Sequence, residues 1–157
     1  MSDIAIFPFL RGFLSQWHPS NFTIDGKAFN CAEQYMMFCK ANLFQDTFMT
    51  DKIMKSEKPS DHKRLGQQVR NFDAKVWETN KKQIVFTGNL AKFSQNAGLK
   101  KKLLATKDSI LVEANPKDII WGVGLSEFDP DIQNPALWRG ENLLGTILME
   151  VREKLSD

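Results

Sequence analysis

Apolar residues recur at helical spacing through most of this chain. The longest such segment starts near Asp73, a candidate cap, and continues to Phe93. The same spacing predicts further helices over residues 47–55, 61–69, 96–106 and 143–155, and one that begins after Asn30. Only one run, Ser109–Glu113, has the composition of a good strand. A chain in which helices outnumber strands in this way is typical of a helix-rich α+β fold and excludes a repeating βαβ unit.

Shorter patterns complete the prediction. Asp25-Gly26 separates two β-prone runs between Phe22 and Phe29, which indicates a hairpin. Asn30 is expected to cap the helix that follows it. Residues 116–135 are rich in Gly, Asp and Pro and are expected to form a loop, and Gly88 is a weak point in the longest helix.

The length and charge limit the classes of function. With 157 residues, the chain is expected to form a single domain over residues 1–157. Its 21 Lys and Arg against 19 Asp and Glu give a net charge of +2. Such a balance argues against a protein that binds nucleic acid through bulk charge, yet it leaves room for a local basic pocket.

The few cysteines and histidines predict neither a disulfide nor a metal site. Cys31 and Cys39 are eight residues apart on a predicted helix, about 12 Å, so we expect two free thiols in a reducing compartment. His18 and His62 are expected on the solvated surface, and no set of ligands has zinc spacing. With neither a signal segment nor a long apolar run, the sequence predicts no membrane partner and a cytoplasmic location, or a nuclear one in a eukaryote.

The common catalytic motifs are absent, which leaves acids, a lysine and tryptophans as candidates. Gly122-Val123-Gly124 lacks the third glycine of a dinucleotide-binding loop, and the sequence has no phosphate loop, nucleophile elbow or HExxH motif. Glu33 is either the second half of a capping box with Asn30 or a carboxylate in the first turn of a buried helix. In the second case, desolvation would raise its pKa and suit it to proton transfer.

Two further acids and one lysine have a structural and a functional interpretation. Asp118 either forms a turn or lies at a pocket rim, and Glu113, at the end of the predicted strand, either lies at such a rim or pairs with Arg or Lys. Lys92 lies in an otherwise apolar helical register. If it is buried rather than solvated, it would pair with an acid, bind phosphate or have a lowered pKa.

The tryptophans and a late glycine turn are the candidate binding elements. Trp77, Trp121 and Trp138 are either core anchors or stacking platforms for a planar base. Gly140 and Asn142 suit a tight turn and a helix cap. The same geometry would also expose backbone N–H groups, which can hold a phosphate.

Short motifs along nearly the whole chain resemble the NADAR, or YbiA-like, domain family. They comprise Phe13-Leu14-Ser15, Pro19-Ser20, Phe22 to Gly26, Ala32-Glu33-Gln34-Tyr35, Lys40-Ala41, Leu65-Gly66, Trp77, Lys92-Phe93, Gln95-Asn96, Leu103 to Thr106, Leu111 to Ala114, Asp118, Trp121 to Gly124, Trp138, Gly140, Asn142, Leu144-Gly145, Leu148-Met149 and Val151-Arg152. The chain departs from the family pattern at Gln16-Trp17, Gln34 and Gln67.

This resemblance implies the YbiA-like fold and an N-glycosidase, a hydrolase that cleaves a ribose C1–N bond without metal or other cofactor. It implies two substrate classes. One is ADP-ribosylated guanine, which would bring transient contact with DNA or other nucleic acid, and the other is the ribosylamino-pyrimidine phosphates of riboflavin synthesis. A chain with this single domain and an intact lysine favours the first. A module that binds ADP-ribose or a nucleotide without cleaving it is the alternative of another class.

The family's functional positions fall on Glu33, Trp77, Lys92 and Asp118. Loss of the base leaves an oxocarbenium-like ribose, which a nearby carboxylate stabilises. We therefore expect Glu33 to act as general acid and base, and Asp118 to stabilise charge or position water. In an alternative mechanism, Lys92 captures the ring-opened sugar as a Schiff base. Trp77, Trp121, Gly122, Trp138, Gly140 and Asn142 are the expected substrate-binding residues.

Overall fold

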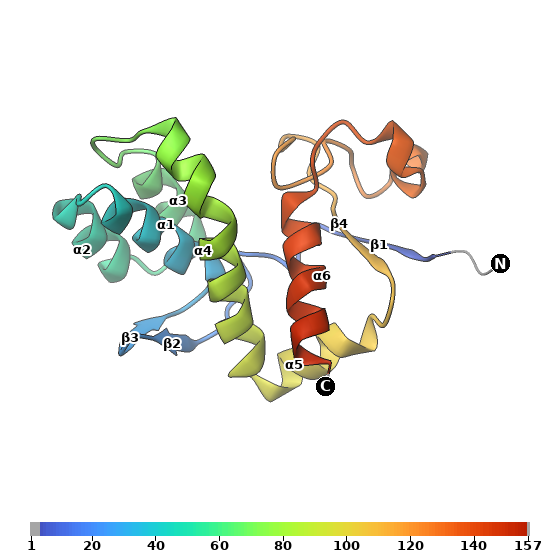
Figure 1. The fold of residues 1–157 in the computed structure, drawn as a ribbon, viewed down its shortest axis with the longest axis horizontal. Helices are drawn as coiled ribbons and strands as arrows, with labels where there is room; N and C mark the ends of the chain where they lie inside the picture. Colours follow the sequence, from blue (N-terminus) through green and yellow to red (C-terminus); the bar gives the residue numbers. More distant parts are fainter. Residues whose placement is uncertain (1–3, 157) are drawn as a thin grey trace. The chain divides into compact units, whose positions relative to one another are not determined.

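The computed structural model describes residues 4–156, which fold as two compact units. The contiguous unit consists of residues 16–96 (Figure 1). The discontinuous unit combines the segment that ends at Ser15 with the segment that begins at Ala97. Six α-helices and four short strands occur in the described residues, so the prediction of a helix-rich α+β fold is confirmed.

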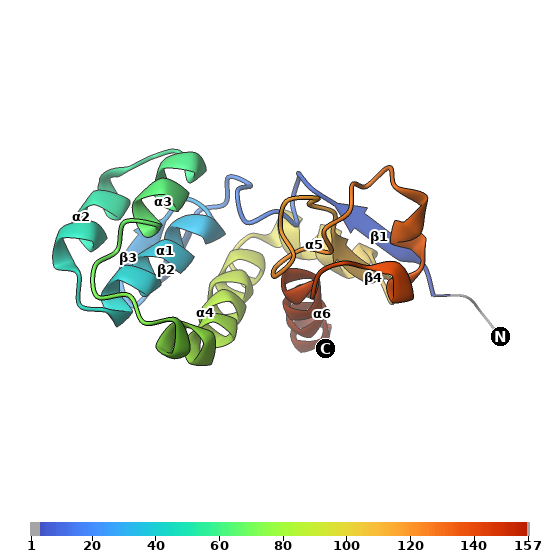
Figure 2. The same ribbon diagram turned by 90° about the horizontal axis from the view of Figure 1, so that it is seen from above.

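The contiguous unit is built around its first helix. Its elements are β2 (Phe22–Ile24), β3 (Lys27–Phe29), α1 (Ala32–Leu43), α2 (Thr47–Lys55), α3 (Pro59–Gly66) and α4 (Ala74–Ser94). Helix α1 packs against α2, α3 and α4, and the two views in Figures 1 and 2 show it among them. Because three helices cover it, α1 holds its first-turn side chains in the interior of the unit.

The hairpin and the longest helix agree with the sequence. Strands β2 and β3 are antiparallel, and the turn residues Asp25 and Gly26 have φ angles of 51° and 78°, the left-handed region that such a turn requires. Asp73 caps α4 by accepting from the backbone N–H groups of Lys75 and Val76. Helix α4 continues through Gly88, whose missing side chain makes room for the ring of Tyr35.

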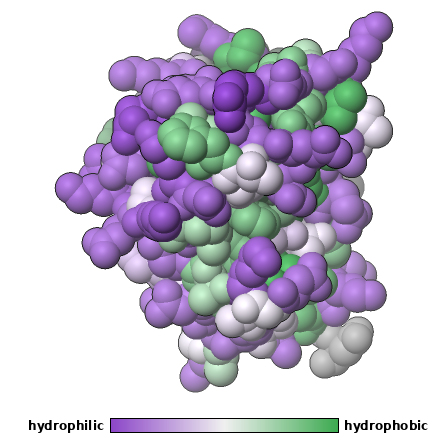
Figure 3. All heavy atoms as spheres, turned by 90° about the vertical axis from the view of Figure 1, so that its left-hand side faces the viewer, coloured by the Kyte–Doolittle hydropathy of each residue, from purple (hydrophilic) through white to green (hydrophobic). Residues whose placement is uncertain are grey.

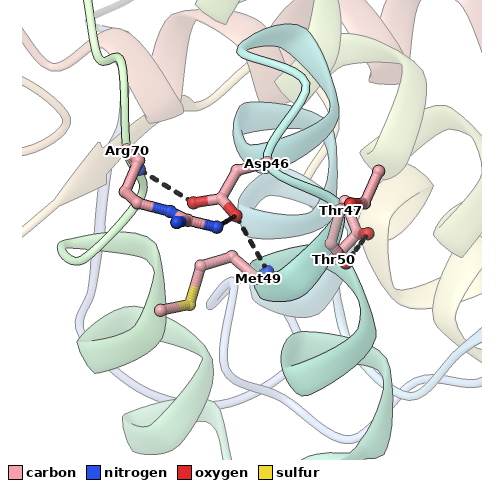
Figure 4. Close-up of polar contacts among 5 residues, drawn as sticks. All are labelled: Asp46, Thr47, Met49, Thr50 and Arg70. Carbon is pink, nitrogen blue, oxygen red and sulfur yellow. Dashed lines mark hydrogen bonds and ion pairs between the residues drawn. The ribbon is translucent and has the colours of Figure 1, made fainter.

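Asp46 joins α2 to the segment after α3. Its carboxylate accepts a hydrogen bond from the backbone N–H of Met49 at 3.1 Å and from that of Arg70 at 2.8 Å (Figure 4). The Arg70 guanidinium adds a contact of 3.3 Å. These donors, the Arg70 backbone N–H first, lower the pKa of Asp46. The buried carboxylate therefore fixes Arg70 next to the start of α2.

The discontinuous unit is a two-stranded parallel sheet with helices. Its elements are β1 (Ile6–Phe9), α5 (Ala97–Ala105), β4 (Ile110–Glu113), the 3-10 turns η1 (Pro130–Gln133) and η2 (Pro135–Leu137), and α6 (Leu143–Leu155). Strand β1 pairs with β4, with Ile6 opposite Ile110 and Phe9 opposite Glu113. Helix α6 packs on β4, and Val112, Val123 and Ile132 form the buried core beside the sheet.

Three local features differ from the sequence prediction. Strand β1 contains Pro8, which lacks a backbone donor and weakens the strand pattern, so the sequence does not indicate it. Helix α3 begins at Pro59, because proline suits the first turn, and it ends at Gly66 rather than residue 69. The expected loop over residues 116–135 contains the short η1 turn.

Candidate active site

Glu33 occupies the first turn of α1 and is buried, with 5% of its surface exposed. Its backbone N–H donates to the carbonyl of Gln16 at 3.0 Å. The expected capping box does not form, because Cys31 is the N-cap residue and makes no side-chain cap. Instead, the backbone N–H of Asn30 donates to the Gln34 side chain at 2.8 Å. The structural alternative for Glu33 is therefore wrong, and its carboxylate lies in the interior of the contiguous unit.

Lys92 is fully buried in the last turn of α4. Burial lowers the pKa of its ammonium group from 10.5 to about 7, and the nearby Cys31 opposes this shift. Its Nζ lies 4.9 Å from the centroid of the Phe93 ring. Of the two interpretations of Lys92 from sequence, solvated or buried, the structure supports the buried one.

Cys31 connects Glu33 and Lys92 electrostatically. Burial first, and then the charge of Glu33, raise the pKa of its thiol to about 11, while backbone hydrogen bonds and the charge of Lys92 oppose the rise. The Glu33 carboxylate and the Lys92 amine therefore both lie within electrostatic reach of this thiol, which belongs to the N-cap residue of α1.

A second buried polar pair lies near this start. The side chain of Asn89 donates from Nδ2 to Gln16 Oε1 at 2.8 Å and to the carbonyl of Val85 at 2.9 Å. Its Oδ1 atom is buried and has no hydrogen-bond partner among the described residues. Gln16, one of the positions that departs from the family pattern, therefore contributes its carbonyl to Glu33 and its side chain to Asn89.

Trp77 is half-buried in the first turn of α4, beside Lys40 of α1. Lys40 Nζ lies 5.8 Å from the Trp77 ring centroid and 4.9 Å from that of Phe72. Burial lowers the pKa of Lys40, and the charge of Glu33 opposes this effect. Lys40 follows Glu33 by seven residues, two helical turns, so both lie on one face of α1.

In the discontinuous unit, Asp118 forms a turn. Its Oδ1 accepts from the backbone N–H groups of Ile120 and Trp121, each at 2.9 Å. The structural interpretation of Asp118 as a turn former is therefore realised. The side chain is half-buried.

The glycines of this unit bring two loops together. A side chain at Gly140 would collide with the backbone of Gly122 and of Ile119, and one at Gly122 would lie 2.9 Å from the carbonyls of Asp118 and Glu113. Close approach of backbone to backbone therefore requires glycine at both positions. The sequence gives no indication of this contact, because the two segments are far apart along the chain.

The prediction that the turn at Gly140 and Asn142 exposes free backbone N–H groups for a phosphate is wrong. The backbone N–H groups of Glu141, Asn142, Leu143 and Leu144 donate to the carbonyls of Ile119, Gly122, Ile120 and Trp121. These N–H groups are therefore not free to hold a phosphate. The Asn142 side chain accepts from the backbone N–H of Glu113 and donates to the carbonyl of Leu111, both at 2.9 Å, so it ties α6 to β4.

The two remaining candidate tryptophans, Trp121 and Trp138, differ in environment. Trp138 packs against the core beside the sheet, and its indole N–H donates to the carbonyl of Ile132 at 2.9 Å, as in a core anchor. Trp121 is half-buried in the loop that Asp118 begins. The predicted residues thus form two groups. Glu33, Lys92 and Trp77 belong to the contiguous unit, and Asp118, Trp121, Gly122, Trp138, Gly140 and Asn142 belong to the discontinuous one.

The prediction for His62 is also wrong. Its ring is fully buried, with Nδ1 2.7 Å from Ser56 Oγ and Nε2 3.2 Å from Asn30 Oδ1, whereas His18 is half-buried.

Both cysteines are free thiols. Within residues 4–156, no cluster of three or more His, Cys, Asp or Glu side chains is suited to hold a metal ion. No helix in this range is both long and apolar enough to cross a bilayer.

Comparisons with known proteins assign the chain to a family. The NADAR domain model matches residues 9–156. N-glycosidase R617 of Acanthamoeba polyphaga mimivirus is 46% identical over 145 residues, 89% of this chain and 85% of that protein. N-glycosidase YbiA of Escherichia coli K12 is 33% identical over 85% of this chain and 74% of its own. Riboflavin biosynthesis protein VVA0006 of Vibrio vulnificus is 30% identical, but this chain spans 36% of it.

The fold comparison agrees with these relatives. The NMR structure of E. coli YbiA matches with a TM-score of 0.80 and 30% identity, over 99% of this chain and 88% of that chain. The expectation of a hydrolase acting on N-glycosyl compounds is confirmed at the level of the reaction class, since R617 and YbiA are named N-glycosidases. By sequence and by fold, this chain belongs to the NADAR domain family.

Proposed function

We propose that this protein removes ADP-ribose from guanine by cleaving the ribose C1–N bond. The observation that carries the proposal is the buried group around the start of α1, where Glu33 and the Lys92 amine both lie close to Cys31. A carboxyl group can move the proton that this cleavage requires, and a neutral amine can attack the sugar carbon in a covalent variant of it.

In the direct mechanism, Glu33 donates a proton to the departing guanine nitrogen as the C1–N bond breaks. Negative charge near the ring stabilises the oxocarbenium-like ribose. Water then forms the new C1–O bond, and its proton returns to the carboxylate. Trp77, which belongs to the same unit as Glu33, would form a wall of the pocket.

In the covalent mechanism, the Lys92 amine forms a bond to C1 while the guanine leaves with a proton from Glu33. In the ribosylamine that results, the ring C1–O4′ bond then breaks as O4′ gains a proton and the nitrogen loses one, which gives the Schiff base of the ring-opened sugar. Water hydrolyses this Schiff base, which regenerates the amine and releases ADP-ribose. With a pKa of about 7, roughly half of Lys92 is neutral at pH 7, compared with about one lysine in 3,000 at a pKa of 10.5. The lowered pKa therefore supports this route.

Two experiments test the roles. Borohydride added during turnover should trap ADP-ribose on Lys92, which mass spectrometry of the digested protein detects. Absence of an adduct on Lys92 would refute the covalent mechanism and leave the direct one. Glu33→Gln should fold normally and lose turnover, and a folded variant with near-normal turnover would refute the role of Glu33.

A second substrate class has a specific observation in its favour, because one relative is named a riboflavin biosynthesis protein. A side-by-side hydrolysis assay with ADP-ribosylated guanine DNA and the ribosylamino-pyrimidine phosphate separates the two. Faster release from the pyrimidine phosphate would overturn our choice. A protein that binds ADP-ribose tightly, hydrolyses neither compound and keeps its affinity in Glu33→Gln would be the non-catalytic module.

A further inference from the structure

The contiguous unit carries exposed aromatic rings paired with cations. Phe48 in α2 is 55% exposed, and Phe72, just before α4, is 47% exposed. Lys52 Nζ lies 4.8 Å from the Phe48 ring centroid, and the Arg70 guanidinium lies 5.9 Å from it. Together with Lys40, which lies over Phe72, these residues form what we call the aromatic–cation strip. Figure 3 shows the face that carries α2, where hydrophobic residues are interleaved with hydrophilic ones.

Packing in the core does not explain why Phe48 and Phe72 are exposed. A large apolar side chain that leaves half of its surface in water gains little from burial. Phe72 does touch the buried Phe44 ring edge-on at 5.4 Å, but no ring-to-ring contact anchors Phe48 among the described residues. A cation close to a ring holds that ring in place and adds positive potential beside its face. The arrangement is therefore suited to a ligand with flat apolar groups and negative charges.

The charges of the strip are available to a ligand. Neither Lys40 nor Lys52 has a carboxylate within ion-pair distance in the described part of the chain. Arg70 contacts the buried Asp46, yet 69% of its side chain is exposed (Figure 4). Nearby Asp51 is exposed in α2 and reduces the local positive charge, whereas the Asp73 carboxylate is engaged in capping α4. Three cations remain around two aromatic faces.

The strip is continuous with the candidate active site. The Lys40 ammonium lies over both Phe72 and Trp77, and Lys40 shares a face of α1 with Glu33. All of these residues belong to the contiguous unit. A strand that placed one modified base beside Trp77 would thus pass its neighbouring nucleotides over Phe72 and toward Phe48.

We propose that the aromatic–cation strip binds the single-stranded nucleic acid that flanks the modified base. Bases would stack on Phe48 and Phe72, and phosphates would contact Lys40, Lys52 and Arg70. Aromatic rings interleaved with cations are the general means of binding single strands without reading their sequence. The inference rests on the proposed function in one respect, since it makes guanine within a strand, rather than a free nucleotide, the preferred substrate.

Binding to an unmodified strand tests the strip without any need for hydrolysis. The probe is a fluorescently labelled single-stranded DNA of about 12 nucleotides, and its anisotropy is followed during titration with the full chain. Phe48→Ala should weaken binding about tenfold, and adding Lys52→Glu should weaken it further. Each lost phosphate contact should also reduce the slope of log K against log salt by about 0.7. Lys63→Glu, an exposed position in α3, is the matched control and should leave binding within about twofold.

The outcomes separate this inference from the proposed function. If the strip variants bind the DNA as tightly as the unchanged protein, or if the control weakens binding equally, the inference is overturned. Absence of DNA binding by the unchanged protein overturns it as well. If the DNA binds through the strip but no ADP-ribosylated guanine is hydrolysed, the inference stands and the proposed function fails. Normal hydrolysis of free ADP-ribosylated guanosine by Phe48→Ala, with slower release from the strand, supports both.

Discussion

Replacing Lys92 with methionine should stabilise the protein near pH 7, and the covalent mechanism requires that the same change abolish activity. The two side chains have similar length, and methionine needs no hydrogen bond or counter-charge in a fully buried position. The pKa of Lys92 falls from 10.5 to about 7 in the folded protein. At about 1.36 kcal/mol for each pH unit, this difference costs the folded state about 5 kcal/mol at pH 7 and below. A cost of that size is a large fraction of the stability of an ordinary domain.

The dependence of the free energy of unfolding on pH shows whether the lowered pKa of Lys92 is the cause of the stabilisation. Between pH 7 and 10.5 the unfolded chain holds a proton on this lysine and the folded chain does not, so the stability of the unchanged protein rises with pH. Lys92→Met removes that dependence. Its advantage should therefore be largest near pH 7 and should shrink by about 3 kcal/mol by pH 9.5.

Urea unfolding from pH 7 to pH 9.5, followed by circular dichroism and tryptophan fluorescence, measures this difference. Lys75→Met, an exposed position in the same helix, is the control and should change the free energy of unfolding by less than about 0.5 kcal/mol at each pH. If the advantage of Lys92→Met stays constant with pH, the amine keeps its ordinary pKa in the folded protein. Lys92 would then not be the neutral, nucleophilic amine that the covalent mechanism requires.

Three further predictions concern other residues. Glu33→Gln should lower kcat by at least about a hundredfold with an unchanged circular dichroism spectrum, because it removes the proton donor; unchanged kcat would contradict this. Burial lowers the pKa of His62, so the free energy of unfolding should fall as pH drops below about 6.5, and this fall should be absent in His62→Gln; equal urea midpoints at pH 5 and pH 7 in the unchanged protein would count against it. Gly140→Ala should cost about 1–3 kcal/mol through collision with the loop at Gly122, and a melting temperature within about 1 °C of the original would refute that contact.

Periodic elements could be predicted from the sequence, and long-range contacts could not. Helices α2 and α6 lie at their expected residues because apolar spacing is a local property. The capping residue of α1 was misassigned, since the buried Gln34 competes successfully for the backbone of Asn30. The burial of His62 could not be foreseen, because its partners Ser56 and Asn30 come together only in the folded unit.

In the candidate site, too, features that depend on local sequence could be predicted, and those that depend on distant segments could not. Lys92 could be singled out because a lysine interrupts an apolar register. Lys40 and Asn89 have no such signature, and their roles depend on neighbours from other segments. The use of the backbone N–H groups before α6 is equally non-local, since the carbonyls that accept from them lie in the loop at residues 119–122.

The order in which the chain is synthesised gives the pairing of β1 with β4 a consequence for folding. Strand β1 leaves the ribosome first, but its partner begins at Ile110, about a hundred residues later. Along the chain, the residues of the contiguous unit come between these two strands, and the unit can complete its own contacts in the meantime. The Gln95 side chain, near one end of the unit, is bonded to the backbone of Thr23 near the other. During that interval, the edge of Ile6–Phe9 that pairs with β4 in the folded protein has no partner. Because Pro8 has no backbone N–H donor, it disfavours pairing of this exposed edge with a neighbouring nascent chain.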